Sequence, residues 1–145
     1  MAIPNAVENL IGLPYLYENG PTTSRHPSEG VNCQLLVHLA LKLLHGIDLP
    51  SAMMSKEIFE DREFFVEIPC DTASLGDIFV FGKTAETDPR QFHLAVKIDD
   101  DAQTQQPLLI HATSIEKTVA VWPLSQFFFY SRYEKLFTVK RLKQP

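Results

Sequence analysis

The chain lacks the features that mark several large classes of protein. No apolar run approaches the length needed to span a bilayer, and the net charge of −5 comes with no basic cluster, so we expect neither membrane nor nucleic-acid partners. Its two cysteines, Cys33 and Cys70, lie in contexts that point to separate elements, and we expect no disulfide between them. The segment 1–10 has neither the positive region nor the apolar core of a signal peptide, which favours a cytoplasmic location.

What the chain does have is the composition of a small globular protein. Hydrophobic residues make up 45% and charged residues 21% of its 145 positions. This length predicts a single domain over residues 1–145, large enough for a proper hydrophobic core.

Cys33 opens a long apolar run that carries its own start and stop signals. Asn32 is a good N-cap and Gly46 suits the left-handed residue after a last turn, so the sequence predicts a helix between them. The thiol would lie in the first turn and lean toward the core, where the positive end of the helix dipole favours its charged form. A thiolate is a strong nucleophile, but most free cysteines are small buried hydrophobes, and position alone leaves both interpretations open.

Two histidines follow inside strand-like segments. Residues 92–98 and 108–112 predict two strands joined by a hairpin connection, and symmetric pairing puts His93 and His111 opposite, or nearly opposite, each other. Ala95, on the same strand face as His93, would let a helix approach closely. A nucleophile, a base and a residue that orients the base make a catalytic triad, so we interpret the cysteine and both histidines as catalytic. A one-residue change of register would send His111 to the opposite face.

In this order the motifs resemble the NlpC-type cell-wall peptidase family, a branch of the papain-like cysteine peptidases. Six segments carry the resemblance: Gly12-Leu13-Pro14-Tyr15, Asn32-Cys33-Gln34-Leu35-Leu36-Val37, Leu49-Pro50, Gly76-Asp77-Ile78-Phe79-Val80-Phe81, His93-Leu94-Ala95-Val96-Lys97 and Ile110-His111-Ala112. The resemblance implies an α+β, papain-like NlpC-type fold, in which a central antiparallel sheet packs against the helix that carries the cysteine at its N-terminus. It also implies a hydrolase that uses a Cys-His-His triad and neither a metal nor an organic cofactor.

The residues around the cysteine depart from the family pattern. Asn32 stands where the family usually has aspartate, Gln34 replaces a serine and Leu35 a glycine. The resemblance places these residues in the substrate groove, so the changes bear on the substrate more than on the chemistry. It also places Tyr15 beside the thiol, while the backbone N–H of Cys33, a free donor at the helix start, would stabilise the oxyanion.

The expected function is hydrolysis of an amide or isopeptide bond in a small peptide. His93 would take the proton from Cys33 or hold a preformed thiolate–imidazolium pair, and His111 would orient the His93 ring. By family analogy the partner is a small peptide or muropeptide, such as a γ-D-glutamyl fragment derived from the cell wall. The sequence leaves the oligomeric state open.

Two other functions fit the same residues. One thiolate and two imidazoles are ligands that zinc accepts, with a fourth position open. The altered residues Asn32, Gln34 and Leu35 also suit a catalytically idle binding module of the same fold.

The remaining segments predict further elements around this site. They are a short helix over 4–11 that buries Val7, Leu10 and Ile11, a charged helix over 55–65, an extended segment over 66–68, a doubly covered strand over 78–81, a strand over 118–122, and an edge strand over 137–142 guarded by Lys140 and Arg141. The aromatic cluster formed by residues 127–130 and Tyr133 is more typical of a core than of a ligand platform.

Overall fold

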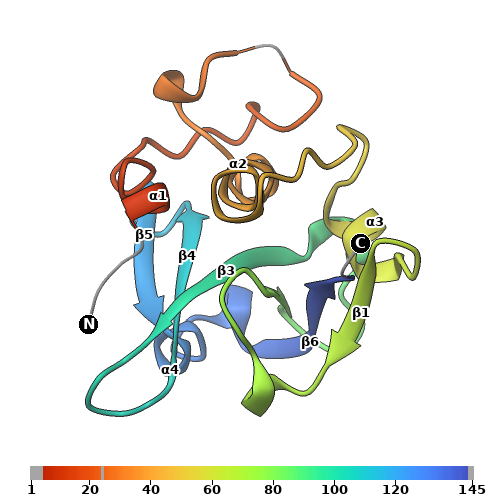
Figure 1. Ribbon diagram of the computed structural model, residues 1–145, viewed down its shortest axis with the longest axis vertical. Coiled ribbons are helices and arrows are strands. Elements are labelled where there is room, and N and C mark those ends of the chain that lie inside the picture. Colours follow the sequence, from red (N-terminus) through yellow and green to blue (C-terminus); the bar gives the residue numbers. More distant parts are fainter. Residues whose placement is uncertain (1–4, 24, 144–145) are drawn as a thin grey trace.

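A six-stranded antiparallel sheet forms the centre of the computed structural model, which describes residues 5–23 and 25–143. The strands are β1 (Phe65–Ile68), β2 (Ile78–Gly82), β3 (His93–Asp100), β4 (Pro107–Thr113), β5 (Thr118–Pro123) and β6 (Lys135–Leu142). Their order in the sheet is β1-β6-β2-β3-β4-β5, and every neighbouring pair is antiparallel (Figure 1). The strands β2 to β5 form a meander, and β6 returns to lie between β1 and β2.

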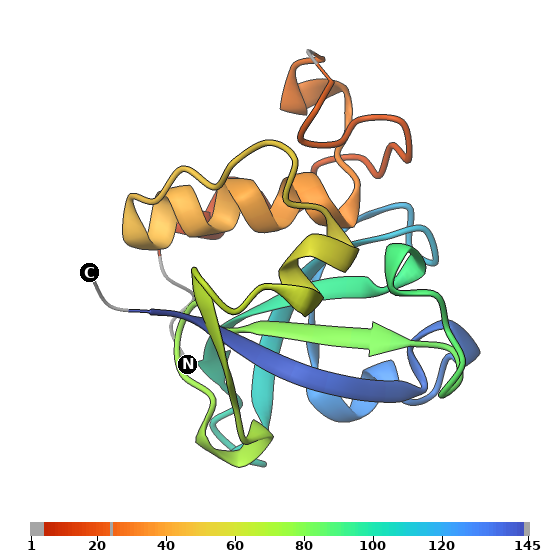
Figure 2. The ribbon, with the colours of Figure 1, turned by 90° about the vertical axis from the view of Figure 1, so that its right-hand side faces the viewer.

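The helices are few, and one of them dominates. They are α1 (Asn5–Glu8), α2 (Cys33–His45), α3 (Ser55–Glu60) and α4 (Leu124–Phe127), with short 3-10 turns η1 (Pro27–Glu29), η2 (Cys70–Thr72), η3 (Pro89–Gln91) and η4 (Ser131–Tyr133). Figure 2 shows α2 lying across one face of the sheet, while α4 lies on the other side. The predicted α+β arrangement, with a cysteine-bearing helix packed on a central antiparallel sheet, is therefore confirmed. None of the helices described in residues 5–23 and 25–143 has the length and apolar character that a membrane crossing requires.

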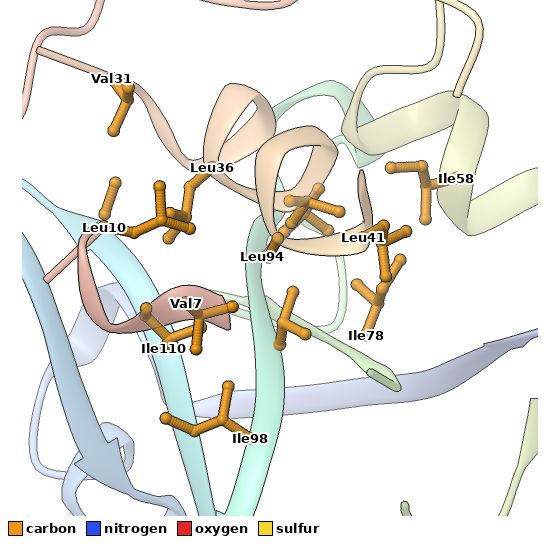
Figure 3. Packing of buried hydrophobic residues seen from close by; sticks show 14 of the residues in the cluster. Val7, Leu10, Val31, Leu36, Leu41, Ile58, Ile78, Leu94, Ile98 and Ile110 are labelled. Atoms are coloured by element: carbon orange, nitrogen blue, oxygen red, sulfur yellow. The ribbon is translucent and has the colours of Figure 1, made fainter. Parts of the chain in front are cut away.

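Strand alternation builds a core on each face of the sheet. On the α2 side, Leu36 and Leu41 of the helix belong to the same apolar cluster as Leu94 and Ile110 of the strands (Figure 3). On the opposite side a second cluster is mainly aromatic and contains Phe79, Phe81, Trp122, Phe127 and Tyr133. Because side chains alternate along a strand, neighbouring residues of β3 contribute to different cores.

The predicted caps fix both ends of α2. The backbone N–H of Leu35 donates to Oδ1 of Asn32 at 2.9 Å, which satisfies one of the free donors of the first turn. At the other end Gly46 adopts a left-handed conformation with φ of 68°, and its N–H donates to the carbonyl of Lys42. The helix begins at Cys33 because Asn32, the residue before it, caps its first turn.

Strand β6 departs from the prediction. It lies inside the sheet, between β1 and β2, and the edges are β1 and β5. Lys140 does not guard an edge: its side chain is fully buried, and Nζ donates to the carbonyls of Phe59 (3.1 Å) and Asp61 (2.7 Å) at the end of α3. Arg141 pairs with the buried carboxylate of Asp77 at 2.9 Å. Both cations therefore tie the sheet to neighbouring segments.

The two short helices are shorter than predicted. The helix expected over 55–65 ends at Glu60, because the Asp61 carboxylate accepts the N–H groups of Phe64 (2.7 Å) and Phe65 (2.9 Å) and turns the chain into β1. The helix expected over 4–11 covers Asn5–Glu8, with residue 4 outside the described residues. Val7 and Leu10 are buried as predicted, whereas Ile11 is 36% exposed.

Leu41 and Leu43 of α2 offer a matched test of the packing. Leu41 is completely buried and Leu43 is 47% exposed. We expect Leu41→Ala to lower the free energy of unfolding by about 3 kcal/mol, because it removes buried methyl groups and leaves a cavity. Leu43→Ala should change it by no more than about 0.5 kcal/mol. Urea denaturation of both variants checks this, and equal losses would contradict the assigned helix face.

Candidate active site

The sulfur of Cys33 lies at the start of α2 in a dry environment. The residue is half-buried, and burial raises the pKa of its thiol to about 11. Four nearby donors act in the opposite direction and lower this pKa: the backbone N–H groups of Leu94, Cys33 and Gln34, and the Ser55 hydroxyl. The structure therefore differs from the expectation that the helix terminus would favour the charged form. Loss of hydration outweighs the favourable donors, and at neutral pH the resting group is a thiol.

The two histidines meet, although they are not directly opposed. The β3–β4 register pairs Val96 with Ile110, which puts His111 opposite Ala95 and two residues away from His93. A shift of two residues keeps both rings on one face of the sheet. Nε2 of His93 lies 2.7 Å from Nδ1 of His111, so the imidazoles share a hydrogen bond across the diagonal of the strand pair.

The face that carries the histidines is the one turned away from α2. Ala95 belongs to the aromatic cluster on that side, so the prediction that it lets a helix approach is wrong. Leu94, the intervening residue, faces the helix and joins its cluster. His93 reaches the neighbourhood of Cys33 because it is the first residue of β3, where the strand begins and its side chain borders the same cavity as the cysteine.

Aromatic rings enclose the histidine pair. The Tyr133 ring stacks on His93 with centroids 4.2 Å apart, while Trp122 and Phe127 lie 4.4 and 4.5 Å from the fully buried His111 ring. Within the described residues, Nε2 of His111 has no hydrogen-bond partner. Burial lowers the pKa of His93 to about 3, with a smaller effect from the charge of Arg132, and burial lowers the pKa of His111 well below its usual value. Both imidazoles are therefore neutral at pH 7.

Cys33 and His93 line a cavity of about 550 Å³. Its walls come from the segment 15–23, the start of α2, Met54, the segment from the end of β2 to His93, the end of β4, and the turn η4 that follows α4. No hydrogen bond between the Cys33 sulfur and the His93 ring is formed among the described residues; the sulfur instead lies near the Leu94 N–H and the Ser55 hydroxyl. His111 lies behind His93 and does not line the cavity.

The residues predicted to bind substrate also border this cavity. Tyr15 pairs with Val31 through a β-bridge, and burial and the nearby Cys33 raise the pKa of its phenol to about 12. Asn32 caps α2 and also donates from Nδ2 to the carbonyl of Tyr17 at 3.2 Å. Gln34 donates to Oγ of Ser55 at 3.0 Å. Asn32 and Gln34 therefore hold the cavity wall together as well as lining it.

Sequence reasoning missed three residues at this site. Ser55 is buried and donates to the carbonyl of Phe92 at 2.8 Å, so it connects Gln34 with the residue just before His93. Tyr133 belongs to the core, as its aromatic cluster predicts, and it also lines the cavity. Arg132 carried no sequence signal, because it lies in a short turn 21 residues beyond His111 and no motif includes it.

The geometry does not favour the zinc alternative. The two histidine nitrogens that approach each other are joined by a hydrogen bond and are not free to bind one ion together. Across residues 5–23 and 25–143, no group of three or more histidine, cysteine or acidic side chains is gathered in a way that would hold a metal ion.

Solved structures with the same fold are cell-wall hydrolase domains and their relatives. The chain is similar to the NlpC/p60 domain of the peptidoglycan hydrolase SagA (17% identity, TM-score 0.59, 97% of each chain) and to an N-acetylmuramoyl-L-alanine amidase from Bacteroides uniformis ATCC 8492 (14% identity, TM-score 0.59, 98% of each chain). It is also similar to NlpC2 from Trichomonas vaginalis (16% identity, TM-score 0.63), where 95% of this chain matches 45% of the other. No protein-family model matches the chain, and no curated protein matches it by sequence. The likeness to these solved structures shows that the protein has the NlpC/p60 fold that its motifs predicted.

The raised thiol pKa predicts a slow, strongly pH-dependent alkylation. In a Cys70→Ser background, iodoacetamide should modify Cys33 about 100-fold more slowly at pH 7 than a free cysteine, because the thiolate fraction falls tenfold per unit of raised pKa. The rate should rise about tenfold per pH unit toward pH 10. The same variant unfolded in urea serves as the control, and a rate that levels off below pH 8 in the folded protein would contradict the buried neutral thiol.

Proposed function

We propose that this NlpC/p60-fold protein is a cysteine hydrolase that cleaves an amide or isopeptide bond in a small peptide. The observation that carries the proposal is the convergence on one cavity of Cys33, at a helix start, and His93, whose ring is bonded to His111. A nucleophile, a base and a group that orients the base are the components that thiol catalysis needs. In the proposed assignment these roles belong to Cys33, His93 and His111.

The hydrogen bond between the histidines defines the protonation state that the mechanism needs. His93 accepts the thiol proton at Nδ1, so its Nε2 carries a hydrogen and donates to Nδ1 of His111. His111 then carries its own hydrogen on Nε2, a buried atom with no other partner among the described residues, in a ring that packs against those of Trp122 and Phe127. Aromatic faces accept weak hydrogen bonds from N–H groups, which favours this tautomer.

Catalysis begins from neutral partners, since the thiol pKa is high and the imidazole pKa low. Substrate binding brings the Cys33 sulfur to Nδ1 of His93, in keeping with the general tightening of catalytic hydrogen bonds in enzyme–substrate complexes. His93 takes the proton as sulfur attacks the carbonyl carbon, and the backbone N–H of Cys33 stabilises the oxyanion. His93 next gives the proton to the leaving amine, and a thioester to Cys33 remains.

Water completes the cycle. His93, neutral again, takes a proton from water as the oxygen attacks the thioester carbonyl, and the carboxylic acid product leaves as the thiol is restored. The cavity wall keeps the charges that form during these steps near the dipoles of the helix start, which act strongly where water is scarce.

The proposed substrate is a small peptide derived from the cell wall, such as a γ-D-glutamyl fragment. Its support is the fold shared with a peptidoglycan hydrolase domain and with an N-acetylmuramoyl-L-alanine amidase. A cavity of about 550 Å³ suits a few residues of peptide. Action in the cytoplasm stays a prediction from the sequence.

A catalytically idle binding module is the second candidate. The neutral thiol and the absence of a Cys33–His93 hydrogen bond among the described residues favour it, as does the use of Asn32 and Gln34 in structural bonds. A binding module would hold the same peptides without cleaving them.

Hydrolysis of small muropeptides and γ-linked dipeptides, followed by chromatography of the products, separates the two candidates. We expect Cys33→Ala to abolish cleavage and His93→Ala to lower kcat/KM by about 100-fold or more, because the general base is lost. His45→Ala is the matched control: His45 is an exposed residue at the far end of α2 and should leave cleavage unchanged. Binding without cleavage by the unaltered protein, across the whole panel, would reject the enzyme in favour of the binding module.

A further inference from the structure

The His93 ring is held by two contacts of different kinds, one at its edge and one on its face. At the edge, Nε2 lies 2.7 Å from Nδ1 of His111, whose ring is inclined by 78° to that of His93. On the face, the Tyr133 ring stacks with the centroids 4.2 Å apart and an interplanar angle of 24°. The hydrogen bond alone leaves the imidazole free to turn about the line that joins the two nitrogens, and the stacked ring removes that freedom.

Tyr133 is itself held in place by Thr113. The Tyr133 hydroxyl lies 2.7 Å from Oγ1 of Thr113, and both residues are buried. Oγ1 of Thr113 also accepts the backbone N–H of Ile115 at 3.1 Å, so the threonine hydroxyl is fixed from a second side. The phenol is therefore anchored at the end farthest from its backbone, and its ring cannot leave His93 without breaking a buried hydrogen bond.

Strand β4 supplies both supports of the His93 ring. His111 and Thr113 are two residues apart on this strand, so their side chains point to the same face of the sheet. His111 supports the edge of the imidazole directly, and Thr113 supports its face through Tyr133. The orientation of the ring is thus set from the strand next to β3, the one that carries its backbone.

Tyr133 supports the ring without adding charge or taking a nitrogen. Burial raises the pKa of its phenol, against the lowering effect of the bond to Thr113, so the phenol is neutral at pH 7. A stacked ring contacts the face of the imidazole, whereas the nitrogens lie in its plane, so the nitrogen that does not face His111 stays available. Tyr133 also borders the cavity that Cys33 lines.

We propose that Tyr133 is the positioning residue of the catalytic base: its ring, anchored by Thr113, fixes the plane of the His93 imidazole and keeps Nδ1 turned toward the cavity. The inference rests on the proposed function and gives Tyr133 a part that the triad residues do not supply. His111 selects the nitrogen of His93 that carries the hydrogen, whereas Tyr133 sets the direction of the free nitrogen. Proton transfer needs both, because it depends on alignment with the donor.

Nuclear magnetic resonance of the histidine side chains tests the proposal without a substrate. The chain has five histidines, and the His93 signals are identified by their loss in His93→Gln. In the unaltered protein at pH 7, Nδ1 of His93 should give the signal of an unprotonated nitrogen and Nε2 that of a protonated one. Tyr133→Leu should average the two signals, because an imidazole that is free to turn loses its fixed hydrogen bond to His111.

Hydrolysis of the peptides named above gives the second measurement. Tyr133→Leu should lower kcat about 10-fold or more, because the base is misaligned. Tyr133→Phe and Thr113→Val each remove the same anchoring bond but keep a ring on His93, and each should lower kcat by about threefold. The double variant should lose no more than either single variant, since a shared bond is lost only once.

Tyr130→Leu is the matched control. It removes a partly buried ring from the same segment, one that stacks on Trp122 and not on His93, and it should leave the His93 nitrogen signals and kcat unchanged.

His93 nitrogen signals that stay separate in folded Tyr133→Leu, as in the unaltered protein, would overturn the proposal. If the unaltered protein cleaves none of the peptides, the proposed hydrolysis fails, and the nitrogen signals still decide the role of Tyr133. If Tyr133→Leu does not fold, the anchored ring is tested by the other variants, and additive losses of kcat in Tyr133→Phe and Thr113→Val would overturn it.

Discussion

The packing of α2 against β3 is the constraint on which the rest of this structure depends. Leu36 and Leu41 of the helix and Leu94 of the strand belong to one apolar cluster, so the helix cannot move along the sheet without losing buried contacts (Figure 3). Cys33 is the first residue of that helix and His93 the first residue of that strand. Fixing the two elements against each other therefore fixes where their starting residues lie, at the rim of one cavity.

The second core gives the site its electrostatic character. The rings of Trp122, Phe127 and Tyr133 surround the histidine pair, and burial is the largest cause of the lowered pKa values that keep both imidazoles uncharged. A neutral thiol and a neutral imidazole differ from a resting ion pair, because in the proposed mechanism charges separate only during the reaction. The N–H groups at the start of α2 lower the pKa of Cys33, and the proposed mechanism uses these oriented donors to stabilise the charge that forms.

Local signals were enough to predict the main parts of this fold. Asn32 and Gly46 set the limits of α2 because capping depends on adjacent residues, and the apolar run 78–81 became a central strand because both of its faces are covered. The histidine pair was expected from the hairpin, but its register was not. The pairing of Asp99 with Leu108 would by itself put His111 opposite Val96, and the shift between Lys97 and Asp99 brings it opposite Ala95, on the same face as His93.

Long-range features escaped the sequence analysis. Strand β6 looked like an edge because its two cations resemble edge protection, whereas Lys140 finds its partners at Phe59 and Asp61, some 80 residues earlier. The pKa of Cys33 also depends on residues that are distant in the sequence, among them Leu94 and Ser55. Arg132 enters the site through a turn that no motif marks. Each of these depends on tertiary contacts that a local pattern does not encode.

The most direct test of the account is to trap the covalent intermediate on Cys33. Mixing the protein with an activated γ-glutamyl ester and quenching in acid should give, by mass spectrometry of the digested chain, an acyl thioester on the peptide that contains Cys33. In His93→Ala the thioester should form about 100-fold more slowly or more, since the thiol then has no base. Acylation at equal rates in the two proteins, or at Cys70 in place of Cys33, would contradict the account.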